Sequence, residues 1–163
     1  MTDDVLTGLA AQLGARLVAR EWRAVTAESC TGGLVAGAIT SIAGSSDWFD
    51  RGFVTYSNEA KIELLGVAPS TLAAHGAVSE ATAIAMAEGA LATSAADVSV
   101  AVTGVAGPGG GTPQKPVGLV CFAWARRGGL SRAATRHLAG NRAAVRQASV
   151  VVALEGLLEL TNS

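Results

Sequence analysis

The chain has 163 residues, of which half are hydrophobic and only 15% are charged, and its net charge at pH 7 is −1. A single domain spanning residues 1–163 can bury a full core, and the scarcity of charge predicts either an unusually complete core or a surface covered in an oligomer, of which a homodimer is the simplest. This balance excludes the basic surface that nucleic-acid binding requires, and the sequence has no apolar run of about 18 residues that would cross a membrane.

The predicted elements alternate between helices and strands. The first is an amphipathic helix whose apolar stripe consists of Leu6, Leu9, Leu13 and Leu17. The others, in chain order, are a strand at 24–27, a helix at 32–43, a strand at 52–56, a short helix at 59–65, a second short helix from Pro69 that Gly76 closes, a helix capped by Ser79 that runs to about Thr93, strands at 97–103, 117–125 and 131–138, and a closing helix at 141–160. This alternation, with one hairpin between the last two strands, predicts an α/β fold: a three-layer α/β/α sandwich around a mixed, mostly parallel sheet.

A nucleophilic side chain lies at the turn between the first strand and the helix after it, in the segment AESCTGG. Ser29 is a candidate nucleophile there, and the alternative is that its hydroxyl only caps the helix. Gly32 and Gly33 allow the backbone to approach a ligand closely, and the N–H groups from Thr31 to Gly33 are candidate donors to an anion or an oxyanion. Cys30 is an alternative nucleophile, since a helix N-terminus lowers the pKa of a thiol, although a buried inert cysteine is the commoner case.

A serine nucleophile needs a base, and Lys61 is the best candidate in the chain. If Asn58 caps the short helix that contains it, Lys61 is the third helical residue, where the helix dipole and partial burial lower the pKa of the amine toward that of a neutral base. Tyr56 is expected to relay a proton or to orient Lys61. The alternatives are an ordinary solvated lysine and a packed aromatic residue. The two histidines, His75 and His137, are predicted to be structural or solvent-facing.

Two further segments are candidates for binding a phosphate or a carboxamide. The glycine-rich loop 104–116 matches neither of the nucleotide-binding glycine motifs, but its backbone N–H groups can cradle an anion, and the alternative is a mobile loop. Its candidate contacts are Thr103, Gly104 and Gly107. Arg142 opens the last helix, where a bound anion would remove the conflict between its charge and the helix dipole. The alternative is that the preceding residue caps the helix and Arg142 points into water.

No metal and no cofactor are expected. The two cysteines, Cys30 and Cys121, and the two histidines are far apart in the sequence and lack the spacing of a zinc site. Two free cysteines fit a reducing compartment better than a disulfide scaffold, and the sequence has no signal-peptide pattern. We therefore expect a cytoplasmic protein.

Taken together, these segments resemble the C-terminal domain family of the competence/damage-inducible protein CinA. The matching blocks cover nearly the whole chain in order: AESCTGG, GSS, RGFVTYSNEAK, LGV, HGAVSE, TGVAGPGGG and KPVG. One departure is Gly140-Asn141-Arg142, where the family usually has Gly-Asp-Arg. Stand-alone members of this family are nicotinamide-nucleotide amidases, so the resemblance implies hydrolysis of the carboxamide of nicotinamide mononucleotide to nicotinic acid mononucleotide and ammonia, in pyridine-nucleotide recycling. Longer members carry an additional N-terminal domain, which we do not expect here.

The resulting hypothesis is a serine amidase with Ser29, Tyr56 and Lys61 as catalytic residues. Lys61, with Tyr56, takes the proton of Ser29, which attacks the carboxamide carbon, and water then cleaves the acyl-enzyme. Backbone N–H groups from Thr31 to Gly33, or from the loop after Thr103, hold the oxyanion. The expected substrate contacts are Thr31, Gly32, Gly33, Thr103, Gly104, Gly107 and Arg142, the last of these with the glycine-rich loop for the phosphate. Two other functions stay open: a non-catalytic nucleotide-binding or regulatory module, and a serine amidase that acts on another amide or a lactam.

Overall fold

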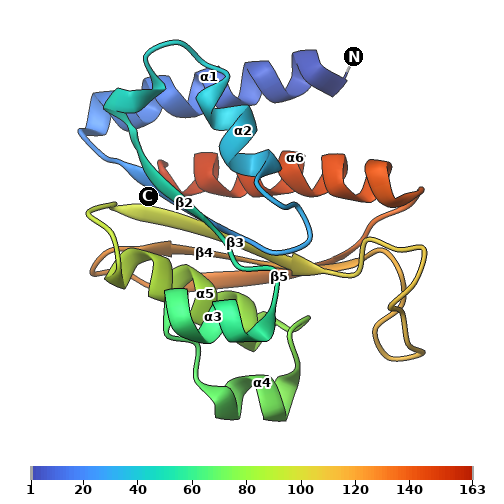
Figure 1. Ribbon diagram of the computed structural model, residues 1–163. Helices are drawn as coiled ribbons and strands as arrows, with labels where there is room; N and C mark the ends of the chain where they lie inside the picture. Colours follow the sequence, from blue (N-terminus) through green and yellow to red (C-terminus); the bar gives the residue numbers. More distant parts are fainter. Residues whose placement is uncertain (1, 163) are drawn as a thin grey trace.

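The computed structural model describes residues 2–162. In chain order, its elements are α1 (Thr2–Arg20), β1 (Ala24–Glu28), α2 (Leu34–Thr40), the 3-10 helix η1 (Ser45–Asp47), β2 (Phe49–Val54), α3 (Asn58–Leu65), α4 (Pro69–His75), α5 (Glu80–Ala92), β3 (Val98–Gly104), β4 (Leu119–Arg126), β5 (Ser131–His137) and α6 (Arg142–Leu160). The strands form one sheet, with α1, α2 and α6 on one face and α3, α4 and α5 on the other (Figure 1). The predicted three-layer α/β/α sandwich is confirmed.

The sheet is mixed, with the strand order β2-β1-β3-β4-β5. β1 pairs in parallel with β2 and β3, whereas the β3–β4 and β4–β5 pairs are antiparallel, so β4 alone opposes the direction of the other strands in the sheet. The connection from β1 through α2 leads to one side of β1, and the connection from β2 through α3, α4 and α5 leads to β3 on its other side. The carboxyl ends of β1 and β3 therefore form a switch point, which is where ligands bind in open α/β sheets.

Each face of the sheet has its own apolar core. Val100 and Val102 of β3 belong to the core under α1 and α6, together with Leu13 and Leu17 of the predicted helix stripe. Ala101, between the two valines, belongs to the core under α5. Successive side chains of a strand point to opposite faces, so one apolar strand contributes to both cores. The high hydrophobic content of the chain is used to cover both faces.

Several predicted element boundaries are wrong, and glycine conformations explain two of them. The strand predicted at 52–56 is β2, Phe49–Val54, and the helix predicted to end at residue 43 ends at Thr40. Gly33 has a φ of 105°, and the helix after the first strand begins at Leu34 rather than at residue 32. Gly118 has a φ of 95°, and β4 begins at Leu119 rather than at residue 117. Both angles lie in the left-handed region, which interrupts a right-handed helix or a strand. The segments predicted to belong to regular elements are instead turns that lead to the carboxyl end of the sheet.

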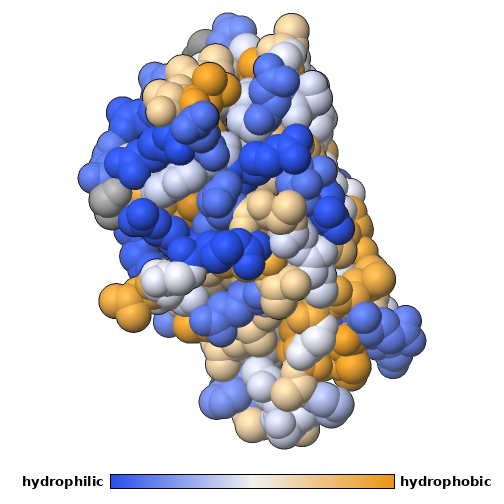
Figure 2. All heavy atoms as spheres, turned by 90° about the vertical axis from the view of Figure 1, so that its left-hand side faces the viewer, coloured by the Kyte–Doolittle hydropathy of each residue, from blue (hydrophilic) through white to orange (hydrophobic). Residues whose placement is uncertain are grey.

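Charged residues close the opposite end of the molecule. Asp50 forms ion pairs there with Arg23 and Arg51, and the guanidinium groups of Arg20 and Arg126 each lie 4.6 Å from the ring of Trp22. Figure 2 shows this end, where many hydrophilic side chains gather. These charged side chains already have partners within the protein, so this end of the sheet offers few unpaired charges to a ligand.

Two kinds of feature are absent from residues 2–162. No helix among them has both the length and the apolar character needed to cross a bilayer. The same residues contain no cluster of three or more histidine, cysteine, aspartate or glutamate side chains arranged to hold a metal ion.

The close contact between α5 and α3 depends on Gly89. A Cβ atom at this position would overlap the carbonyl oxygen of Leu65, the last residue of α3. The absence of a side chain therefore lets α3 lie directly against α5, and this contact sets the distance of α3 from the sheet.

We expect Gly89→Ala to lower the free energy of unfolding by about 1–3 kcal/mol, because α3 must shift to admit the methyl group. The matched control is Gly8→Ala in α1, where an added Cβ would have nothing within 4 Å. That change should instead stabilise the protein by roughly 0.5–1 kcal/mol, since alanine is the better helix former. Urea unfolding of both variants tests this, and equal effects of the two substitutions would contradict it.

Candidate active site

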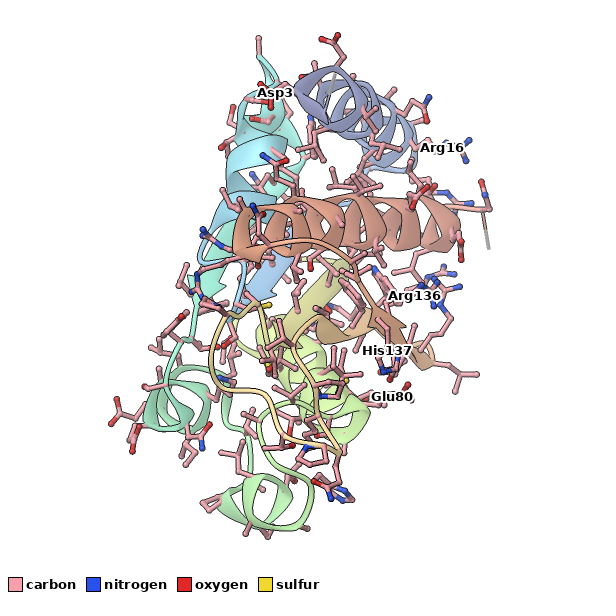
Figure 3. The ribbon with its side chains drawn as sticks, turned by 90° about the vertical axis from the view of Figure 1, so that its right-hand side faces the viewer. Asp3, Arg16, Glu80, Arg136 and His137 are labelled. Atoms are coloured by element: carbon pink, nitrogen blue, oxygen red, sulfur yellow. The ribbon has the colours of Figure 1, made fainter. Side chains whose placement is uncertain are left out.

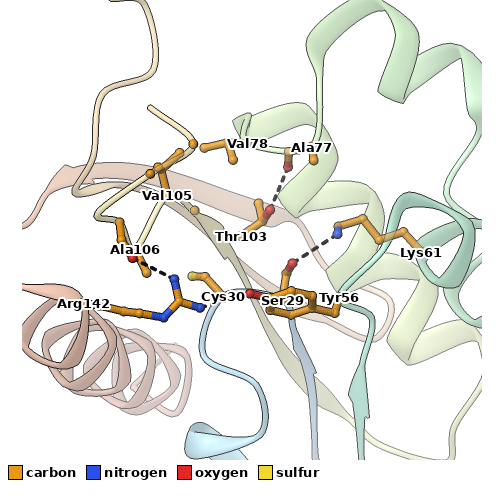
Figure 4. Close-up of a pocket in the computed structure, with 14 residues that line it drawn as sticks. Ser29, Cys30, Tyr56, Lys61, Ala77, Val78, Thr103, Val105, Ala106 and Arg142 are labelled. Atoms are coloured by element: carbon orange, nitrogen blue, oxygen red, sulfur yellow. Dashed lines mark hydrogen bonds between the residues drawn. The ribbon is translucent and has the colours of Figure 1, made fainter. Parts of the chain in front are cut away.

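A cavity of about 310 Å³ opens at the carboxyl ends of β1 and β3, at the switch point of the sheet. Figure 4 shows the side chains that reach it from the turn after β1, from α3, β3 and α6, and from the segments between these elements. The predicted site residues that line it are Ser29, Tyr56, Lys61, Thr103, Gly104, Gly107 and Arg142. The other predicted contacts, Thr31, Gly32 and Gly33, do not belong to its lining. One cavity thus brings together residues from five separate segments of the chain.

Ser29 and Lys61 form a hydrogen-bonded pair inside this cavity. The Nζ atom of Lys61 donates to the Oγ atom of Ser29 at 3.2 Å and to the carbonyl oxygen of Thr55 at 2.9 Å. The Lys61 side chain is 1% exposed, and this burial lowers the pKa of its amine below the ordinary value of 10.5. The N-cap of α3 is Ser57, not Asn58, so Lys61 is the fourth helical residue and burial, rather than the helix dipole, dominates the shift.

The geometry of the pair suits proton transfer from serine to lysine. A neutral amine has N–H donors and one lone pair. With one N–H directed at the Thr55 carbonyl, the lone pair of Lys61 can accept the hydroxyl proton of Ser29. A serine hydroxyl is a weak nucleophile until a base takes this proton, so the arrangement supplies the activation that the reaction needs.

Ser29 does not cap α2. The N-cap residue is Gly33, which makes no side-chain cap hydrogen bond. The buried carboxylate of Glu28 serves the helix instead, because it accepts the N–H groups of Gly33 at 3.2 Å, Val35 at 2.9 Å and Ala36 at 3.1 Å. The sequence analysis missed Glu28. The available signal was a carboxylate at the end of a strand whose other residues are uncharged.

The N–H groups of the turn are partly used within the protein. Gly32 donates to the carbonyl of Ser29 at 3.0 Å, and Gly33 donates to Glu28 at 3.2 Å. Contrary to expectation, neither is free to face an oxyanion. Across the described chain, the N–H groups of Cys30 and Thr31 have no backbone or side-chain oxygen as acceptor. Of these two residues, Cys30 lines the cavity next to Ser29, whereas Thr31 does not.

Arg146 of α6 holds the turn from the opposite side. Its Nε atom donates to the carbonyl of Cys30 at 3.1 Å, and its Nη2 atom lies 3.4 Å from the carbonyl of Thr31. A Cβ atom on Gly32 would lie 3.3 Å from this Nη2 atom. Because Arg146 binds the carbonyls of Cys30 and Thr31, it orients the peptide planes that contain them. Glu28 and Arg146 together fix the conformation of the turn.

Cys30 is a poor nucleophile in this structure. Its side chain is buried, and desolvation raises the pKa of the thiol to about 11. The expectation that a helix N-terminus lowers this pKa is wrong because burial outweighs it. The thiol is therefore protonated at neutral pH, and the geometry favours the hydroxyl of Ser29 over the sulfur.

Tyr56 and Arg142 contact each other rather than the Ser29–Lys61 pair. The Nη2 atom of Arg142 donates to the Tyr56 hydroxyl at 3.1 Å, and its Nη1 atom donates to the carbonyl of Gly107 at 2.8 Å. No hydrogen bond joins Tyr56 to Lys61 within residues 2–162. Asn141 caps α6, as one alternative anticipated, and Arg142, although exposed to water, also lines the cavity. The guanidinium thus ties the first turn of α6 to two walls of the cavity.

The glycine-rich loop is fastened at both ends. The hydroxyl of Thr103, at the end of β3, donates to the carbonyl of Ala77 at 2.8 Å, and the Nζ atom of Lys115 donates to the carbonyl of His75 at 2.6 Å. Figure 3 shows the loop between α6 and the helices of the opposite face, at the end of the molecule that holds the cavity. The loop therefore forms a wall of the cavity together with the segment after α4, which the sequence analysis did not include.

Comparison with known proteins places this architecture among relatives. The CinA C-terminal domain family matches residues 6–161. A nicotinamide-nucleotide amidohydrolase, PncC, of Escherichia coli K12 is 52% identical over 157 residues, which cover 96% of this chain and 95% of the relative. A putative competence-damage inducible protein of Symbiobacterium thermophilum is 57% identical over 150 residues, but these are only 35% of that longer protein. The crystal structure of the competence/damage inducible protein CihA from Agrobacterium tumefaciens matches this fold with a TM-score of 0.93 and 49% sequence identity. The match covers 98% of this chain and 96% of the CihA chain.

The contacts of Glu28 lead to a stability prediction. We expect Glu28→Gln to lower the free energy of unfolding by about 1–3 kcal/mol, because an amide NH₂ replaces one acceptor oxygen and faces a buried N–H group of α2. The matched control is Glu63→Gln, which changes an exposed glutamate of α3 and should stay within about 0.5 kcal/mol of the wild type. Chemical denaturation measures both, and a Glu28→Gln variant as stable as the control would refute the capping role.

Proposed function

This chain belongs to the CinA C-terminal domain family, and from that premise we propose that it hydrolyses the carboxamide of nicotinamide mononucleotide to nicotinic acid mononucleotide and ammonia. The observation that carries the proposal is the 3.2 Å hydrogen bond between Ser29 and the buried amine of Lys61 inside the cavity. Relatives that are 52% identical over nearly their whole length bear the name nicotinamide-nucleotide amidohydrolase, which supports this substrate over other amides.

The reaction proceeds through an acyl-enzyme. Lys61 takes the hydroxyl proton of Ser29, and the Oγ atom attacks the carboxamide carbon to form a tetrahedral intermediate. The C–N bond then breaks, and the Lys61 ammonium returns the proton to the departing nitrogen, which leaves as ammonia. A water molecule, deprotonated by the neutral amine of Lys61, attacks the ester and releases the carboxylate and Ser29. Lys61 takes up and returns each proton of the cycle, so the reaction needs no external base.

The turn and the wall of the cavity supply the remaining groups. The N–H group of Cys30 stabilises the negative charge on the carboxamide oxygen in the tetrahedral intermediate, as a preorganised donor beside the nucleophile. Arg142, at the N-terminus of α6, binds the phosphate of the nucleotide together with backbone N–H groups of the loop after Gly104. The guanidinium then exchanges its contacts with Gly107 and Tyr56 for charged oxygens, which are stronger acceptors.

Tyr56 takes part in this mechanism only after the substrate has bound. Its hydroxyl lines the cavity but is bound to Arg142. When the phosphate of the substrate engages Arg142, the hydroxyl is released and can take part in moving the proton between Lys61 and the leaving nitrogen. The proton relay is therefore available only in the substrate complex.

Substitution of Ser29 tests its role as the nucleophile. Ser29→Ala should lower kcat for ammonia release from nicotinamide mononucleotide by at least about 10³-fold, because the acyl-enzyme cannot form. Cys30→Ala, which changes the neighbouring thiol, is the matched control and should retain activity within about tenfold. A coupled ammonia assay measures both. Wild-type rates for Ser29→Ala would exclude the serine mechanism, and ligand-induced thermal stabilisation without any turnover by the wild type would indicate a binding module instead.

The lowered pKa of Lys61 predicts how activity and stability depend on pH. The value of kcat/KM should rise with pH as Lys61 loses its proton, and the midpoint of this rise should lie below pH 10.5. Lys61→Met, which removes the base, should lose at least about 10²-fold in activity. Between the native pKa of Lys61 and 10.5, the unfolded state binds more protons than the native state, so the stability of the wild type should rise with pH relative to Lys61→Met. Denaturation at several pH values checks this without an activity assay, and parallel stability curves would contradict it.

A further inference from the structure

Tyr56 has an unusual position for an aromatic residue. It is the single tyrosine of the chain, and no other aromatic residue lines the cavity among the described residues. Its side chain is 62% exposed, so the ring is not part of either core. Exposed aromatic rings at the mouth of a cavity are a common means of binding flat or cationic ligands.

The ring is nevertheless held in place. Its hydroxyl accepts a hydrogen bond from Arg142, which is itself bound to the carbonyl of Gly107. Tyr56 follows β2, and Ser29 follows β1, the strand with which β2 pairs. Both residues therefore leave neighbouring strands at the same end of the sheet, and both line the cavity (Figure 4). An aromatic ring is therefore positioned beside the nucleophile without being packed into the protein.

Among residues 2–162, the cavity has no carboxylate that could pair with a positively charged part of the substrate. No aspartate or glutamate of the described chain lines this cavity, whereas Lys61 and Arg142 both do. The nicotinamide ring of the mononucleotide is an N-alkylated pyridinium, which carries a permanent positive charge. A cation in this cavity meets no carboxylate, and the π-face of Tyr56 is the group there that attracts it.

Building on the proposed function, we propose that the ring of Tyr56 is the specificity element that selects a cationic pyridinium carboxamide over an uncharged one. With its carboxamide at Ser29, the pyridinium lies within one ring's breadth of the nucleophile and reaches the neighbouring tyrosine. In the free protein the hydroxyl holds the ring at the cavity through Arg142, and in the complex the ring itself recognises the charge. Free nicotinamide and other neutral amides lack the positive charge that the aromatic face attracts, so they are the poorer substrates.

The experiment compares two ligands that differ in ring charge. Nicotinamide mononucleotide has a cationic ring, and its 1,4-dihydro form has the same carboxamide, ribose and phosphate on a neutral ring. Their dissociation constants are measured by calorimetry in a Ser29→Ala background, alone and combined with Tyr56→Leu or Tyr56→Phe. Tyr56→Phe is the matched control, because it removes the hydroxyl and its bond to Arg142 but keeps the aromatic face. Melting temperatures verify that each variant is folded.

We expect Tyr56→Leu to reduce the preference for the cationic ligand, expressed as the ratio of the two dissociation constants, by about 5- to 30-fold. Tyr56→Phe should leave this ratio within about threefold. An unchanged ratio in Tyr56→Leu, or an equal fall in both variants, would overturn the inference while leaving the proposed function intact. The proposed function fails separately, and this inference with it, if the unmodified protein releases no ammonia from nicotinamide mononucleotide and Ser29→Ala does not bind it.

Discussion

The buried amine of Lys61 is the constraint around which the site is built. An amine removed from water needs hydrogen-bond partners and favours its neutral form, and both conditions are met by the carbonyl of Thr55 and the hydroxyl of Ser29. Lys61 lies on α3, the helix that packs closely against α5 at Gly89. A substrate with a cationic ring would lower the pKa of the same amine further, since two positive charges at short range disfavour protonation. Binding and activation of the base would then reinforce each other.

The two helix N-termini near the cavity are treated differently. The N-terminus of α2 is already neutralised by the buried carboxylate of Glu28, which accepts three of its N–H groups. This end of the helix therefore rigidifies the turn that carries Ser29 and does not attract an anionic substrate. The N-terminus of α6 carries Arg142 and no acidic residue in its first turn, so its field is free to act on a phosphate. One helix positions the nucleophile, and the other is the candidate anion site.

The sequence predicted the parts of this structure that follow from local pattern. The alternating valines of β3 and the leucine stripe of α1 indicate buried faces directly. The position of Ser29, Tyr56 and Thr103 at the ends of strands likewise predicted that they would meet at one cavity. Contacts that depend on three-dimensional packing were not predictable in this way. Whether Glu28 faces solvent or three buried N–H groups is decided by the path of the chain after Gly33, and the pairing of Tyr56 with Arg142 joins residues 86 positions apart. The pKa of the Cys30 thiol was misjudged for the same reason, because its burial is a tertiary property.

The clamp that Arg146 places on the turn spans 116 positions of sequence. A nascent chain that has emerged only as far as β5 already contains Ser29, Lys61 and all five strands, but it lacks the helix that orients the peptide planes beside the nucleophile. Contacts of such long range are among the last to form during folding. The hydroxyl–amine pair would therefore stay poorly organised until the final helix docks, which delays chemistry in the cell until synthesis of this domain is finished.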